Sequence, residues 1–387
     1  MWSKFLDRLK RQGPAWIWRR LRFEWMTPTT GPGRTWLRAR LRARAAWRYL
    51  VRQFGGAGGV PTSDDTLYTF YDLQVAPITF DVLWFMAAAE LRRRECGLRR
   101  IAVMIVPGRE RGLRAEDPAY EAVVEPNERR TRIDTVLLQA LSLSPEIESA
   151  VLAKDRAEAA ALRRAARHVY PALYDVALPS AHEPPEVMDA ARQGRLAQRL
   201  RAPEDFRNWV ARWIAANAGE RRLVTVTLRQ YGYRQSRNSD IGAWGQFARG
   251  LDPARYAVAV VPDTAESGKP MPEEFRGCLY LPETALDVRL RLALYEAAFV
   301  NLGVNCGPLH MSLFTERPVR CLMFKLLPED PEYAAEAWPY MRALGFVAGE
   351  TPPNSRPGQK WVWRPDTYPV ITGEFEALVA EIEAGRA

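Results

Sequence analysis

The chain has 387 residues, of which 55 are Lys or Arg and 46 are Asp or Glu, so its formal net charge is +9. Residues 1–52 contain 14 basic and only 2 acidic side chains, a net charge of +12, whereas the rest contains 41 basic and 44 acidic ones. The excess of positive charge is confined to this segment, which excludes a nucleic-acid-binding surface over the whole protein. The apolar fraction of 47% excludes global disorder, and the length favours two domains.

Cysteine and histidine are scarce. The four cysteines have no CxxC spacing, and three histidines are too few for a His-based metal centre, so we expect no bound metal. No apolar run approaches the roughly 20 residues needed to cross a bilayer. Charged residues also interrupt the apolar residues at the N-terminus, unlike in a secretory signal. We therefore expect a cytoplasmic protein, either in solution or peripheral on the inner face of a membrane.

Residues 1–60 are predicted to form a basic arm, which contains six of the 13 tryptophans. Apolar and basic residues alternate over 2–25, turn residues follow at 27–33, and apolar residues at helical intervals predict a helix over 34–54. The glycine-rich run 55–59 predicts a hinge. Arginines beside tryptophans favour binding of residues 1–54 to an anionic membrane surface. The alternative is that the apolar stripe packs on the rest of the chain.

Residues 61–215 are predicted to form a first α/β domain. Its apolar strands do not alternate with polar residues, which is typical of a parallel sheet covered on both faces. We expect strands at 66–71, 101–106, 149–153 and 175–178, a connector at 179–185, and helices at 80–95, 128–141, 157–168 and 203–218.

Residues 216–345 repeat this alternation in a second domain, and we expect residues 346–387, with a helix at 375–384, to pack back on the body. The two sets together predict an α/β fold with two Rossmann-like domains that face each other across a cleft. The second set has expected strands at 223–228, 256–261, 278–281, 299–302 and 319–324, and helices at 241–250, 286–298 and 309–315.

In such sheets ligands bind beyond the carboxyl ends of the strands, and the loop 229–240 follows the first strand of the second domain. It contains arginines, tyrosines and amide or hydroxyl groups ahead of a helix, a composition that suits a nucleotide diphosphate. The alternative is a solvated loop in which Asn238, Ser239 or Asp240 only caps the helix. The candidate donor-binding residues are Arg229, Tyr231, Tyr233, Arg237, Asn238 and Ser239.

A second loop, 305–310, follows the strand at 299–302 and should open on the same sheet edge. Gly307 permits close approach of the backbone, and Pro308 suits the first turn of a helix. Asn305 and His310 are candidates to contact a phosphate or ribose. The alternative is an ordinary strand-to-helix turn that binds nothing.

Two carboxylates of the first domain are candidate general bases. Asp72 follows a predicted strand, where it could accept a proton from an acceptor hydroxyl. Asp81 begins a predicted helix, so capping is the stronger interpretation for it.

The motifs GxSxG, GxxxxGK[ST], HExxH and Asp-x-Asp are missing. A bound diphosphate would then be neutralised by cationic side chains and helix termini, without a cofactor or metal.

The second domain resembles the donor-binding domain of GT-B glycosyltransferases. The segment 300–310, with Cys306-Gly307-Pro308-Leu309-His310, resembles the Ser/Gly-Pro-x-His element of heptosyltransferase-like enzymes. The strand that ends at Arg229 resembles that of fucosyltransferase-like members, whose arginine binds phosphate. Cys306 departs from the usual hydroxyl residue, and the acidic residue expected soon after the arginine is absent.

The resemblance implies metal-independent transfer of a sugar from a nucleotide-sugar donor to a glycan or lipid-linked acceptor. Asp72 or Asp81 would deprotonate the acceptor, while Arg229 and the helix terminus at His310 would stabilise the leaving diphosphate. The departures favour an alternative, a non-catalytic scaffold recruited to a membrane or partner by the arm. A third hypothesis, nucleic-acid binding through the arm, finds no continuing basic track in the body, so no nucleic-acid partner is expected.

Overall fold

The computed structural model describes residues 31–54, 60–109, 111–179, 184–197, 199–327 and 345–386, with residues 334, 337–339 and 341–342. Contacts divide the chain into two compact units. Unit 1 comprises residues 1–77, 92–115 and 148–182, and unit 2 comprises residues 78–91, 116–147 and 183–387.

Unit 1 is built on a four-stranded sheet with the order β3-β2-β1-β4. The central strand β1 pairs in parallel with β2 and with β4, so that Thr69 lies opposite Val103 on one side and Tyr170 on the other. Phe70 stacks on Tyr174 in the core, with 4.6 Å between the ring centroids. The elements of this unit are α3(Gly31–Phe54), β1(Thr66–Asp72), β2(Arg100–Val106), β3(Ile147–Leu152), α8(Arg156–Ala165) and β4(Val169–Tyr170).

Unit 2 is built on a six-stranded parallel sheet with the order β10-β9-β8-β5-β6-β7. Counted along the chain within this unit, the strand order is that of a Rossmann sheet, with the reversal between β5 and β8. The elements of this sheet layer are α10(Glu204–Asn217), β5(Arg222–Thr227), α11(Ile241–Gly250), β6(Tyr256–Val261), β7(Leu279–Tyr280), α12(Glu283–Leu286), α13(Val288–Ala297), β8(Val300–Val304), β9(Cys321–Phe324), β10(Gln359–Trp361) and α15(Tyr368–Glu383).

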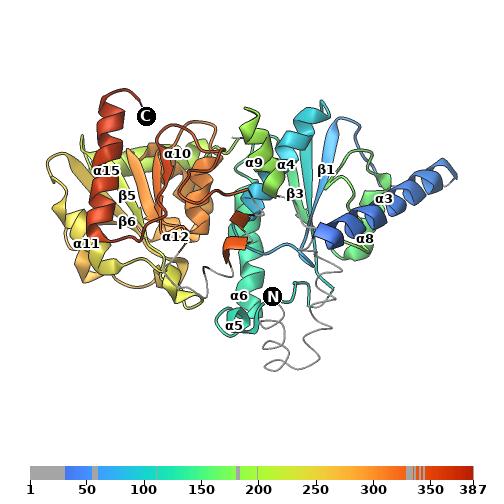
Figure 1. Cartoon of the computed structure of the whole chain (residues 1–387), viewed down its shortest axis with the longest axis horizontal. Helices are drawn as coiled ribbons and strands as arrows, with labels where there is room; N and C mark the ends of the chain where they lie inside the picture. Colours follow the sequence, from blue (N-terminus) through green and yellow to red (C-terminus); the bar gives the residue numbers. More distant parts are fainter. Residues whose placement is uncertain are drawn as a thin grey trace. The chain divides into compact units, whose positions relative to one another are not determined.

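Apolar side chains hold α11 and α15 on this sheet, with α15 beside α11 in Figure 1. Trp244 of α11 is fully buried and packs edge-on against Phe324 of β9 and Phe247. The predicted α/β class, with two parallel Rossmann-like sheets, is confirmed.

The division between the units differs from the predicted boundary at residue 216. Segments 78–91, 116–147 and 183–215 belong to unit 2, as does the tail. The reason is long-range packing, which a linear pattern does not report: the Gln139 side chain, for example, accepts a hydrogen bond from the Val288 amide. The segments that join unit 2 in this way contain most of α4(Val82–Glu95), then α5(Pro118–Glu121), α6(Pro126–Arg132), the π-helical η1(Ile133–Leu138), α7(Gln139–Leu141) and α9(Pro184–Arg192).

Two local predictions, for one helix and one strand, were wrong. The helix expected over 128–141 is interrupted by the π-helical η1. The connector expected at 179–185 overlaps α9 from Pro184 onward, and its residues 180–183 lie outside the described residues. The strand expected at 175–178 is a turn, because the Asp175 carboxylate accepts the Ala177 amide, and the strand lies at Val169–Tyr170 instead.

The helix predicted over 34–54 is confirmed as α3, although it begins at Gly31, inside the predicted turn. The predictions for 2–25 and for the hinge at 55–59 lie outside the described residues. Among the helices that the structure describes, none is long and apolar enough to cross a membrane.

Candidate functional site

The reversal of strand order in unit 2 places the two predicted ligand loops next to each other. The loop 229–240 follows β5, the turn 305–310 follows β8, and these strands are paired in parallel. The connections that follow these two strands pass to opposite faces of the sheet. At such a point the carboxyl ends of the strands border a crevice, and ligands bind in it. The two loops are joined directly, because an Arg237 Nη2 donates to the Asn305 carbonyl at 3.0 Å.

Several polar residues of the first loop build the loop itself. Its base is closed by two bonds of 2.9 Å, from the Arg229 amide to the Ser239 hydroxyl and from the Ser239 amide to the Arg229 carbonyl. Inside it, the Asn238 amide group bonds both the nitrogen and the carbonyl of Tyr231 at 3.1 Å. Ser239 and Asn238 were predicted to contact the ligand, and the side chains of both instead form these hydrogen bonds within the loop.

Arg229 is 7% exposed, and its guanidinium also bonds within the loop. It donates to the carbonyls of Tyr233 at 2.9 Å and of Arg234 at 3.2 Å, and to the Asn238 side chain. Buried arginines that satisfy several carbonyls fix the backbone around them. These contacts favour a positioning role for Arg229 over the predicted phosphate contact.

The partly exposed tip of the loop contains Tyr231, Tyr233, Arg234 and Arg237. Arg234 has a φ of 54°, in the left-handed region that non-glycine residues seldom adopt. Such backbone conformations persist where the surrounding contacts hold them, and they gather at functional sites. The tip is therefore the part of the loop that combines an unusual backbone conformation with access to solvent.

The chain segment from α5 to α6 supplies residues to this tip that the sequence analysis missed. An Nη2 of Arg132 donates to the Tyr231 hydroxyl at 2.9 Å, and an Nη1 donates to the Tyr120 hydroxyl at 3.3 Å. The Tyr120 ring packs edge-on against Tyr233 at 5.3 Å, and burial raises the pKa of Tyr120. Arg132 directly precedes the π-helical η1, and π-helical turns are frequent at functional sites. The sequence alone did not indicate its role, because its partners Tyr120 and Tyr231 lie 12 and 99 residues away.

The N-terminus of α11, predicted as an anion site, already has carboxylates. Asp240 caps the helix by accepting the Ala243 amide at 3.0 Å. Asp366 accepts the Asp240 amide and the Trp244 indole at 2.9 Å, and it forms an ion pair with Lys325 at 2.6 Å. The capping interpretation therefore holds for Asp240, and Lys325, which follows β9, is a second cation that the sequence analysis missed.

The turn after β8 is packed against the beginning of α4. A Cβ on Gly307 would lie 2.9 Å from the Cβ of Phe80, so only glycine fits at this position. Pro308 lies in the first turn of η5(Gly307–Leu313), a 3-10 helix where a short helix was predicted over 309–315. The Cys306 thiol is buried, which raises its pKa and keeps it protonated at neutral pH.

His310 uses both ring nitrogens. Its Nδ1 accepts the Trp84 indole N–H at 3.3 Å, so the proton of the neutral ring is on Nε2, which lies 3.1 Å from the Asn305 side-chain oxygen. Burial lowers the pKa of His310 to about 4. At neutral pH His310 therefore offers a hydrogen bond and no charge.

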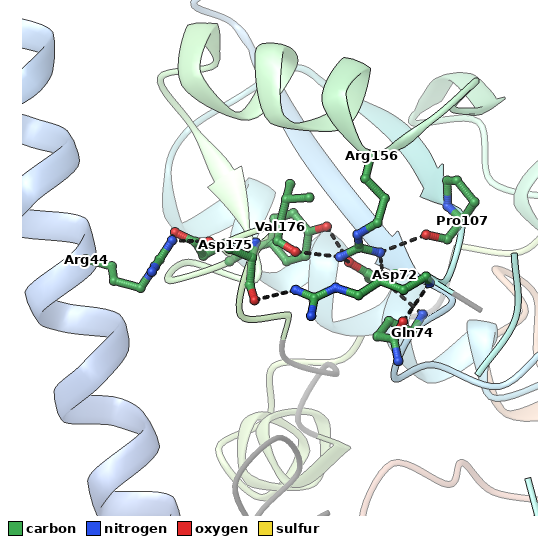
Figure 2. Close-up of polar contacts among 10 residues, drawn as sticks. Arg44, Asp72, Gln74, Pro107, Arg156, Asp175 and Val176 are labelled. Atoms are coloured by element: carbon green, nitrogen blue, oxygen red, sulfur yellow. Dashed lines mark hydrogen bonds and ion pairs between the residues drawn. The ribbon is translucent and has the colours of Figure 1, made fainter. Parts of the chain in front are cut away.

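Asp72, at the carboxyl end of β1, is 2% exposed and lies in a closed cluster (Figure 2). Both carboxylate oxygens accept the Arg156 guanidinium at 2.9 Å, and one also accepts the Tyr174 hydroxyl at 2.6 Å. Arg156 further donates to the carbonyls of Pro107 and Val176. The cluster thus joins four chain segments at this sheet edge, and it favours a structural role for Asp72 over the predicted general base.

Asp81, the other candidate base, is exposed and precedes α4 in unit 2. Its carboxylate accepts the Thr79 hydroxyl at 2.6 Å, and its negative charge acts to raise the pKa of His310 against the larger effect of burial. Of the two carboxylates, Asp81 is the one that solvent reaches and that belongs to the same unit as the two loops.

Two further features of the structure bear on the choice of site. Within the part of the chain that the structure describes, no group of three or more His, Cys, Asp or Glu side chains could hold a metal ion. A cavity of about 310 Å³ lies between α11 and α15, lined by residues such as Leu251, Arg255 and Tyr368. It borders the amino end of β6, the sheet edge opposite to the one where α/β folds bind ligands.

No family model matches the chain, and no curated protein matches it. Its structure is similar to the family 9 glycosyl transferase from Veillonella parvula, with 8% identity, 82% of this chain and 97% of that chain covered, and a TM-score of 0.47. It is also similar to the ADP-heptose heptosyltransferase II of E. coli, with 13% identity, 82% and 99% covered, and a TM-score of 0.48. A third similar structure is the fucosyltransferase NodZ from Bradyrhizobium, with 10% identity, 64% and 92% covered, and a TM-score of 0.26.

Proposed function

We propose that the chain is a glycosyltransferase of the GT-B type. It transfers a sugar from a nucleotide-sugar donor to a hydroxyl of a glycan or lipid-linked acceptor, without a metal, at the cytosolic face of a membrane. The observation that carries the proposal is the meeting of the β5 and β8 loops through Arg237 and Asn305, at the strand reversal of a Rossmann-ordered sheet.

The charges around these loops suit a diphosphate. Arg234 and Arg237 lie in the partly exposed loop, and Arg132 contacts Tyr231 beside them. Guanidinium groups bind phosphate oxygens through paired hydrogen bonds, and fixed cations stabilise charge as it develops on a leaving group. His310 would add a neutral donor through Nε2 once Asn305 gives way to the ligand.

The proposed reaction breaks the bond between the sugar C1 and the diphosphate oxygen and forms a bond from C1 to the acceptor oxygen. The proton of the acceptor hydroxyl passes to Asp81, which solvent reaches, and the nucleoside diphosphate leaves with its charge held by the arginines. Asp72 is not assigned the proton, because both its oxygens are engaged by Arg156 and Tyr174.

Nucleotide binding tests the proposal directly. Titration calorimetry of the full chain with GDP, UDP and ADP in the presence of EDTA should detect binding of at least one of them. Arg237→Ala should weaken this binding by about tenfold or more, since hydrogen bonds to charged groups contribute about 1.5–3 kcal/mol. The matched control is Arg212→Ala, an exposed arginine on α10, which should bind as the unaltered chain does. Binding of none of the three nucleotides would overturn the proposal.

A second candidate function is a non-catalytic scaffold with a cleft that binds nucleotide. The closed Asp72 cluster and the buried Cys306 favour it, because neither residue can act on a substrate as it stands. Release of nucleoside diphosphate from UDP-, GDP- and ADP-sugars distinguishes the two. Nucleotide binding without release from any donor, over a panel of glycan and lipid-linked acceptors, would favour the scaffold.

A further inference from the structure

Helix α3 has one face that is attached to unit 1. Leu37, Leu41 and Arg44 lie on this face, because they are spaced by four and three residues. Leu41 is 4% exposed, and the Arg44 guanidinium donates to both carboxylate oxygens of Asp175 at 2.8 and 3.0 Å (Figure 2). The Asp175 side chain is 9% exposed, so this ion pair and the buried Leu41 attach this face of α3 to the rest of unit 1.

Two tryptophans lie along one edge of the solvent-exposed side of α3. Trp36 is 55% exposed and Trp47 is 68% exposed. They are eleven residues apart, about three helical turns, so they lie in one stripe with Ala43 between them. Exposed tryptophans in the same stripe of a helix indicate a surface that another apolar phase covers.

Arginines share the exposed side of α3 with these tryptophans. The sequence of α3 contains seven arginines and no acidic residue. Arg38 and Arg42 are both exposed and four residues apart, so they lie in one row along the other edge of this side. A partner with a negative surface would match this row of positive charge.

We infer that α3 binds an anionic lipid bilayer through the face that contains Trp36 and Trp47, while its other face stays attached to unit 1. Tryptophan rings are suited to the headgroup region of a bilayer, and the flanking arginines to anionic lipid headgroups. A nucleic acid would use the arginines and leave the apolar stripe exposed, and a second copy of α3 would bring two sets of arginines together. Lipid is the partner that matches both the stripe and its flanks.

This binding would orient unit 1 on the membrane. Asp175, which holds Arg44, immediately precedes Val176, whose carbonyl accepts Arg156 of the Asp72 cluster. The attachment of α3 thus continues into the carboxyl edge of the unit 1 sheet. A lipid-linked acceptor would then reach the protein from the membrane surface that α3 binds. This statement about the acceptor rests on the proposed function, whereas the binding of α3 to lipid does not.

Co-sedimentation of the full chain with vesicles tests the inference. The chain should sediment with vesicles of phosphatidylcholine and phosphatidylglycerol and far less with phosphatidylcholine alone. The double variant Trp36→Ser/Trp47→Ser, and separately Arg38→Glu/Arg42→Glu, should each lower the partition coefficient by about tenfold or more. The matched controls are Trp209→Ser, which removes an exposed tryptophan of α10, and Arg212→Glu/Arg317→Glu, which reverse exposed charges of unit 2. Both controls should change the partition less than threefold.

The thermal midpoint of each variant and its affinity for nucleotide are measured alongside. Unchanged values would show that the fold and the loops of unit 2 are intact, so that loss of vesicle binding reports on α3 alone. Equal partition of the tryptophan variant and the unaltered chain would overturn the inference. Binding of duplex DNA or RNA in preference to vesicles would also overturn it, as would a finding that the main effect of the α3 variants is loss of a dimer. Vesicle binding by a chain that binds no nucleotide would overturn the proposed function and leave this inference standing.

Discussion

The reversal points of the two parallel sheets lie at the same topological position and use their polar groups in opposite ways. In unit 1 the strand that reaches this point ends at Asp72, which is buried with Arg156 and Tyr174 in a cluster of matched charges and donors. In unit 2 the corresponding strand leads to a loop with a closed base and a partly exposed, cationic tip at Arg234 and Arg237.

The difference shows that topology selects where a ligand can bind, while burial and charge balance decide whether one does. A carboxylate whose oxygens are all engaged has little left to offer a substrate, whereas arginines at a loop tip can turn to an anion. Substitutions at the two sheet edges test this contrast.

Asp72→Asn should strongly destabilise the protein. The substitution leaves the guanidinium of Arg156 beside a neutral amide, and removing one partner of a buried ion pair costs about 3–5 kcal/mol. Urea unfolding followed by circular dichroism measures the change. Asp81→Asn, at an exposed carboxylate, should alter the free energy of unfolding by less than about 0.5 kcal/mol.

The same two variants separate the structural role from the chemical one. At a temperature where both are folded, release of nucleoside diphosphate should fall by about a hundredfold or more in Asp81→Asn, because a general base contributes at least this much. An Asp72→Asn protein that is as stable as the unaltered chain but inactive would reverse the assignment of the two carboxylates.

His310 should make stability depend on pH in a defined window. Its pKa is lowered to about 4 in the folded state, whereas the unfolded chain has the ordinary value near 6.5. Between these values the unfolded state binds a proton that the folded state does not, so the free energy of unfolding should decrease by about 1–3 kcal/mol as pH falls from about 6.5 to 4. His310→Gln should remove this part of the pH dependence in urea titrations, and His168→Gln should keep it. A pH profile that is the same with and without His310 would contradict the buried neutral ring.

Much of the fold could be predicted because its strands are continuous apolar runs. The segment 223–228 and the turn around Gly307 are local signals, and they correctly predicted a Rossmann-like sheet and adjacent loops. The unit boundary could not be predicted in this way. The pairing of Arg132 with Tyr231 and of Gly307 with Phe80 joins residues 99 and 227 positions apart, and no spacing in the sequence reports it.

The roles of single polar residues were also beyond the sequence. Arginine in a loop after a strand predicts anion binding, but Arg229 has carbonyl groups of its own loop within reach and is buried among them. Asp72 likewise lies against a partly buried arginine from α8 and a buried tyrosine from the segment after β4. Composition gives the kinds of polar groups present, and only the fold determines which of them form hydrogen bonds or ion pairs with one another.

The smallest expected effects compare the two reversal points most directly, because the same atom is removed at each. Tyr174→Phe deletes a buried hydroxyl that donates to the Asp72 carboxylate, and it should cost about 1.5–3 kcal/mol of stability with no change in nucleotide affinity. Tyr231→Phe deletes a hydroxyl that accepts from Arg132, and it should cost only about 0.5–1.5 kcal/mol because both side chains are partly exposed to solvent, which weakens the bond to the charged group.

Tyr231→Phe should nevertheless weaken nucleotide binding several-fold. The ring remains in the variant, with its centroid 5.7 Å from the guanidinium carbon of Arg132 and 5.6 Å from that of Arg229. Arg132 nevertheless loses the hydrogen bond that holds it beside the loop tip. Urea unfolding and calorimetry on both variants give the four values needed. If Tyr174→Phe changed nucleotide affinity more than Tyr231→Phe, the cluster around Asp72 would be part of the ligand site, and the contrast between a closed and an open sheet edge would be wrong.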